Sequence, residues 1–122
     1  MEQELNAEKL RDAIASMAVE AWRFKGTFSR AMDKLDAGEG QKYMSKFNWF
    51  MKKVEQGLEE AHLRTVEFTG QEFNEGMPVN AINLDDFGAD EHLYISQTIE
   101  PVIMNDDAIF KTGTVVLERY EQ

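Results

Sequence analysis

The sequence has no cysteine, only two prolines and no apolar run of the roughly 20 residues that a membrane-spanning helix needs. Without cysteine, disulfides and thiolate chemistry are excluded. The first ten residues also lack the basic start and the apolar stretch of a signal peptide. We therefore expect a cytoplasmic protein.

Basic residues are scarce as well. Thirteen Lys and Arg stand against 23 Asp and Glu, which gives a formal net charge of -10. Such a chain repels phosphate backbones and anionic lipids unless its basic residues are segregated, and we see no such segregation. We therefore expect no nucleic-acid or membrane partner, and we expect a protein partner with a basic surface.

Motifs for catalysis or metal binding are missing too. His62 and His92 have no H-E-x-x-H spacing or cysteine near them. The letters Asp86-Phe87-Gly88 occur without the glycine-rich and catalytic loops of a kinase, so they indicate a solvated turn. Adjacent Asp106 and Asp107 between two strands indicate a hairpin turn. We predict no enzyme activity, no cofactor and no metal.

What the sequence does contain is a long amphipathic pattern in its first half. Between residues 5 and 35, apolar residues recur at alternating spacings of four and three, which is typical of a helix that packs along another helix. A helix of that length spans about 46 Å, more than a compact domain of this mass covers by itself. We therefore expect a homodimer to supply a second long helix. The predicted seam consists of Leu10, Ile14, Met17, Ala21, Phe24, Phe28, Ala31 and Leu35.

A second helix is predicted from Gln41 to about His62, after a glycine-containing stop at residues 36–41. Its apolar positions also recur at three and four, and aromatic residues widen the stripe. Within this helix we expect Phe47, Phe50 and Val54 to lie at the dimer interface.

After Arg64 the composition changes to β-branched residues in short alternating runs, which predict strands. The runs are TVEFT, MPVNAINL, HLYISQTI, AIFK and TVVLERY, with turns predicted at residues 70–76, 85–91, 105–107 and 112–113. We therefore predict an α+β protein with two domains. Residues 1–64 form a helical dimerisation region and residues 65–122 form a small all-β domain.

Residues 54–77, VEQGLEEAHLRTVEFTGQEFNEGM, resemble the junction between helices and β-domain in the GrpE family of nucleotide-exchange factors. Residues 106–117 look like the closing hairpin of that family, with Lys111 where the pattern has its second Arg. Two departures stand out: the His-Glu-Ala of the family is replaced by Pro78-Val79-Asn80, and its Arg-Pro-Ala by residues 111–113. The matching positions at the junction are Leu58, Leu63, Val66, Gly70 and Phe73.

The resemblance implies a dimeric helical bundle followed by a β-domain that binds the ATPase domain of a DnaK-type chaperone and promotes ADP release. The implied mechanism needs no covalent chemistry. Phe73 has two interpretations, core packing or direct partner contact. The missing signatures leave an alternative open, a non-enzymatic scaffold or regulatory module that keeps the fold and binds a different protein. Our candidates for the partner contact are Phe73, Met77, Pro78, Ile103, Met104 and Lys111.

Overall fold

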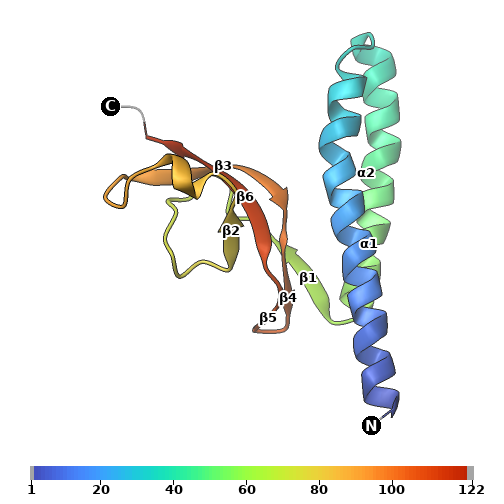
Figure 1. Ribbon diagram of the computed structural model, residues 1–122. Helices are drawn as coiled ribbons and strands as arrows, with labels where there is room; N and C mark the ends of the chain where they lie inside the picture. Colours follow the sequence, from blue (N-terminus) through green and yellow to red (C-terminus); the bar gives the residue numbers. More distant parts are fainter. Residues whose placement is uncertain (1, 121–122) are drawn as a thin grey trace. The chain divides into compact units, whose positions relative to one another are not determined.

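The computed structural model describes residues 2–120 and divides into two compact units, Met1–Arg64 and Thr65–Gln122 (Figure 1). Two helices come first and all the β-strands follow, so the α+β class predicted from the sequence is confirmed. Within the described residues, neither helix combines the length and the apolar character that crossing a membrane requires.

The helical unit is a hairpin of α1, Glu2–Met32, and α2, Ala37–Glu60 (Figure 1). The predicted start of the second helix at residue 41 was wrong, because Asp36 caps α2. Its carboxylate accepts a hydrogen bond from the backbone N–H of Glu39 at 2.9 Å, as an aspartate at a helix N-cap does. The two glycines that the sequence analysis placed in a loop therefore lie in the first turns of α2.

The strands form two three-stranded sheets with the orders β1-β4-β5 and β2-β6-β3. In the second sheet β2 runs parallel to β6, whereas β3 runs antiparallel to it. None of the predicted strand runs contains β4. This strand follows β3 after a single proline, Pro101. The strands are β1 Leu63–Val66, β2 Val79–Ala81, β3 Leu93–Glu100, β4 Val102–Asn105, β5 Ala108–Lys111 and β6 Gly113–Arg119.

Nearly half of the β-unit is one long hairpin, residues 93–119, that passes from one sheet to the other midway. Its tip is the Asp106-Asp107 turn, which the structure confirms: β4 and β5 pair there, with Asn105 opposite Ala108. Asp106 has a φ of 54°, in the left-handed region where aspartate is tolerated in tight turns.

Both arms of the hairpin change sheets at one crossing point, and Gly113 lies there. A Cβ at Gly113 would be 2.8 Å from the carbonyl oxygen of Glu100, so only glycine fits without a backbone shift. The sequence analysis expected a turn at Thr112-Gly113 as part of a closing hairpin. That was wrong, because the chain runs from β5 into β6 without reversing direction. Strands β5 and β6 both pair with the other arm of the hairpin, which consists of β3 and β4.

The core of the β-unit lies on the β3–β6 sheet. Four side chains are buried there, and partly buried side chains from the preceding loop pack around them. The loop between β1 and β2 is held to β3 by hydrogen bonds between the backbones of Gly70 and Ile95 and of Phe73 and Leu93. The buried residues are Leu93, Ile95, Val115 and Leu117, and those packed around them are Phe68, Phe73, Met77, Val79, Ala81 and Phe87.

Candidate protein-interaction surfaces

The buried residues of α1 are small, and they are not those of the predicted seam. Ala15, Ala18 and Val19 are exposed by only 1%, 4% and 2%. The closest described ring contact between α1 and α2 joins Phe28 and Phe47, which stack at a centroid distance of 4.9 Å. Phe47 was predicted to lie at the dimer interface, but it is buried within the α1–α2 hairpin of its own chain.

Most of the predicted seam remains outside this packing. Leu10, Met17 and Phe24 are 64%, 72% and 52% exposed, although all are large and apolar. Ala31 is exposed on α1, and Leu35, beyond the end of the helix, is 38% exposed. The remaining seam residues, Ile14, Ala21 and Phe28, are partly buried.

Several exposed apolar residues of the two helices lie on one side of the hairpin. The rings of Phe24 and Phe50 both contact the ring of Phe47, at 6.2 and 5.9 Å. Phe50 is 48% exposed, and Tyr43, seven residues before it and so on the same side of α2, is 41% exposed. Val54 on α2 is partly buried. We call this surface the hairpin face and define it as Leu10, Met17, Phe24, Ala31, Tyr43 and Phe50.

In the β-unit, two of the candidate contact residues belong to the core. Phe73 and Met77 are partly buried and pack against the core cluster, and the N–H of Phe73 donates to the carbonyl of Leu93 at 2.9 Å. Of the two interpretations of Phe73, the structure therefore favours core packing. Its acidic neighbours Glu72 and Glu75 are exposed.

The other candidates lie around the crossing point of the long hairpin. Ile103 is 0% exposed, so its side chain is unavailable to a partner and we leave it out of the proposed contact. Met104 and Lys111 on β4 and β5 are partly exposed, as is Pro78. The carbonyl of Pro78 accepts a hydrogen bond from the N–H of Gly113 at 3.0 Å, which places Pro78 near Lys111. The structure thus brings Pro78 and Lys111 to one region.

Charge is distributed very unevenly between the two units. Residues 1–64 contain eleven Lys and Arg and eleven Asp and Glu, so the helical unit is neutral. Residues 65–122 contain twelve Asp and Glu against only Lys111 and Arg119. The entire formal charge of -10 therefore resides in the β-unit, and the expectation that basic residues are not segregated was wrong.

One exposed ion pair in the β-unit, between Arg119 and Glu91, makes further contacts with neighbouring residues. Arg119 donates from Nε to a carboxylate oxygen of Glu91 at 2.7 Å, and its guanidinium lies 4.8 Å from the centroid of the Phe87 ring. The hydrogen bond from Arg119, assisted by one from the N–H of Gly88, lowers the pKa of Glu91 below its ordinary value. This pair closes the loop before β3 and is a structural contact.

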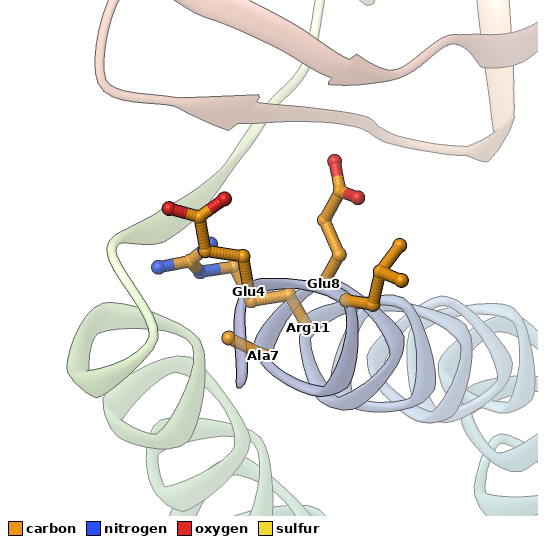
Figure 2. A pocket seen from close by; sticks show the side chains of 5 residues that line it. Glu4, Ala7, Glu8 and Arg11 are labelled. Atoms are coloured by element: carbon orange, nitrogen blue, oxygen red, sulfur yellow. The ribbon is translucent and has the colours of Figure 1, made fainter. Parts of the chain in front are cut away.

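An open hollow lies beside the N-terminal turns of α1, and Figure 2 shows the side chains that line it. Its lining residues are Glu4, Leu5, Ala7, Glu8 and Arg11, and none of them is buried. Across residues 2–120, no three His, Asp or Glu side chains gather as metal ligands would. The hollow therefore has none of the buried, converging groups that an active site uses.

Comparisons with protein-family models, with curated proteins and with solved structures found no match. The function is therefore argued from the two surfaces just described, the apolar hairpin face and the acidic β-unit.

Proposed function

We propose that this protein is a GrpE-like adaptor, a homodimer whose β-unit binds the ATPase domain of a DnaK-type chaperone and promotes ADP release. The observation that carries the proposal is the combination of an uncovered apolar helical hairpin with a separate, self-contained acidic β-unit. The first of these suits assembly of two chains, and the second suits recognition of a third molecule.

The dimer is supported by the hairpin face. Large apolar patches on one side of a protein commonly mark interaction sites, because leaving such side chains in water forgoes about 25 cal/mol per Å². Residues seven apart on each helix present the same side over several turns, which is the geometry that a second helical hairpin can match. A second copy offers an identical face, so a two-fold axis makes the contact self-complementary.

The chaperone contact is supported by residues that the resemblance singles out and by their place in the fold. Gly70 has a φ of 88°, where glycine is needed, and Leu58 and Leu63 are 1% and 2% exposed. On the surface, Pro78 and Lys111 lie near the crossing point, with Met104 on the adjacent strand β4. The charge of the β-unit favours a basic partner surface and fast, salt-dependent association.

The proposed mechanism is a shift in a conformational equilibrium. An adaptor that binds the open nucleotide cleft more tightly than the closed cleft increases the open population and so accelerates ADP release. No titrating or covalent group of the adaptor takes part. The required quantity is only a difference in affinity between the two states of the chaperone.

The experiment that tests the proposal measures the release of a fluorescent ADP analogue from the DnaK-type chaperone of the same genome. We expect an excess of this protein to accelerate release, and Met104→Ala with Lys111→Ala to reduce the acceleration by about tenfold or more. The exposed Lys9→Ala serves as a matched control and should retain full acceleration. Unchanged release together with no complex would contradict the proposal.

The alternative function is a scaffold or regulatory module with the same architecture and another protein partner. It is favoured by the segment that replaces the His-Glu-Ala of the family, because this segment is used for folding. Val79 and Asn80 pair with Gly113 and Thr114 of β6, and Val79 packs on the core. A dimer that forms normally but leaves ADP release unchanged would support this alternative.

A further inference from the structure

The outer side of α2 carries a positive stripe that the adaptor function does not use. Lys42, Lys46, Trp49 and Lys53 are spaced by four, three and four residues, so they lie on one side of the helix. Trp49 is two residues after Phe47, about 200° around the helix, and the two side chains differ accordingly in exposure, 63% against 8%. We call these four residues the lysine stripe.

The lysine stripe lies in a stretch without any acidic residue. Between Glu39 and Glu55 the chain contains four lysines, including Lys52, and no Asp or Glu. All four lysines are exposed, and none forms an ion pair with a side chain of residues 2–64. The charge of the stripe is therefore not neutralised within the described part of the helical unit.

The arrangement is unfavourable for the isolated helix. Lys42 and Lys46 are four residues apart, and like charges at that spacing destabilise a helix. Trp49 leaves a large aromatic surface in water, and its only described ring contact is with Lys53, whose Nζ lies 5.1 Å from the ring centroid. Local features that oppose folding without an evident gain are typical of binding sites.

We propose that the lysine stripe binds a short acidic segment of another protein. Carboxylates at the same four-three-four spacing on a helical segment would meet the three lysines, and an apolar side chain beside them would cover Trp49. The stripe spans about 16 Å from Lys42 to Lys53, which corresponds to three turns of such a segment. None of the four residues belongs to the hairpin face or to the β-unit, although Lys46 lies beside Tyr43 and Phe50 on α2. The chaperone contact proposed above does not use them.

An acidic segment is favoured over extended polyanions because of the rest of the chain. The chain has a formal net charge of -10, which opposes binding to a long polyanion such as a nucleic acid or to an anionic membrane. A short peptide with a few carboxylates meets less of this repulsion. The aromatic residue also suits a protein partner, because tryptophan and basic side chains are enriched at such interfaces.

The test uses Trp49 as its own reporter. In the Trp22→Phe variant Trp49 is the only tryptophan, so a blue shift of its fluorescence reports burial of the stripe. The probe is a synthetic helical peptide with the four-three-four spacing of the stripe, in which three glutamates face the three lysines and a leucine faces Trp49. A second peptide with glutamine at the three glutamate positions, phosphatidylserine vesicles and a single-stranded oligonucleotide are titrated in parallel.

We expect the glutamate peptide to shift the fluorescence and the glutamine peptide to bind at least tenfold more weakly. In the same background, Lys42→Glu with Lys46→Glu and Lys53→Glu should weaken peptide binding by about tenfold or more. The matched control, Lys9→Glu with Lys25→Glu and Lys34→Glu, makes the same change of charge at exposed positions of the same unit. It should bind the peptide within about twofold of the parent.

Three outcomes would overturn the proposal. One is equal binding of the glutamate and glutamine peptides, and another is an equal loss in the control variant. The third is tighter binding of vesicles or oligonucleotide than of the peptide at physiological salt. If the stripe variant loses helicity by circular dichroism, the single Lys42→Gln and Lys53→Gln variants replace it, and each must weaken binding at least twofold.

Discussion

The two units of this protein differ in how completely they bury their large apolar residues. In the β-unit, Ile95, Val115 and Leu117 are at most 1% exposed, and loop aromatics pack around them. In the helical unit the buried residues of α1 are small, whereas Met17 and Phe24 are more than half exposed. The β-unit completes its core within one chain, whereas the helical unit leaves large apolar side chains exposed.

The two units also differ in their net charge. The helical unit is neutral and the β-unit holds the full charge of -10. A neutral apolar surface suits self-association, because two helical units carry no net charge that would make them repel each other. A strongly acidic unit resists self-association and attracts basic partners, so the two units are suited to different contacts.

The largest expected effect comes from a large-to-small substitution in the core of the β-unit. Ile95 is 0% exposed, so Ile95→Ala should lower the unfolding free energy of the β-unit by about 2–5 kcal/mol through lost burial and a cavity. Chemical denaturation followed by circular dichroism measures the change. Both tryptophans lie in the helical unit, so the fluorescence transition should move much less. Ile109→Ala is the control, since Ile109 is 55% exposed and should cost below 1 kcal/mol.

A charge on the hairpin face tests whether the helical unit depends on a second chain. Met17→Asp should weaken self-association by about 2–3 kcal/mol, roughly a hundredfold, because a carboxylate would be buried against the partner. Sedimentation equilibrium over a range of concentrations measures it. Ser16→Asp introduces the same charge at an adjacent exposed position of α1 and should leave association unchanged. Equal behaviour of the two variants would place the interface elsewhere.

The order of elements was predictable from local pattern, because periodicity distinguishes helices from strands and adjacent aspartates mark a turn. Details that depend on distant residues were not. Glycine is required at position 113 because Glu100 and Val102 of the other arm lie against it, and no neighbour in sequence indicates this. The start of α2 was missed for a different reason: Asp36 was available as an N-cap, but the following glycines suggested a loop.

The candidate surfaces show the same limit. Heptad spacing identified the apolar seam of α1, but spacing alone does not say which side α2 covers, and α2 packs beside smaller residues. In the β-unit, the resemblance placed both Ile103 and Met104 on the contact surface. Adjacent residues of a strand point to opposite faces, and Ile103 is on the buried face, 0% exposed. The charge division, in contrast, was visible in the sequence once the unit boundary was drawn.

A pair of glycine substitutions sharpens the comparison within the helical unit. A Cβ at Gly57 of α2 would meet no atom within 4 Å, so Gly57→Ala should stabilise the isolated chain by about 1 kcal/mol through helix propensity. At Gly40 a Cβ would lie 2.9 Å from the carbonyl oxygen of Met32, so Gly40→Ala should destabilise it. Thermal unfolding at low concentration measures both. Stabilisation by Gly40→Ala would contradict the packing of the hairpin.

The smallest expected effect concerns the one ion pair of the β-unit whose pKa values are shifted. The hydrogen bond from Arg119 is the main cause that lowers the pKa of Glu91, and the N–H of Gly88 assists it. A carboxylate whose pKa is lower in the folded state adds stability above its unfolded pKa, and this stability is lost as the pH falls through the folded pKa. Because the pair is exposed, the pH-dependent part should be small and weaken with salt.

Arg119→Met isolates this effect, since the apolar chain still covers the Phe87 ring on which the guanidinium lies. We expect the pKa of Glu91 to rise toward its ordinary value and to stay slightly below it, because the hydrogen bond from Gly88 remains. Carboxyl-carbon NMR titration of Glu91 in the two proteins measures the difference. Identical titration curves would mean that the Arg119 contact does not persist in solution. In that case the loop before β3 is held by the core contact of Phe87 and not by charge.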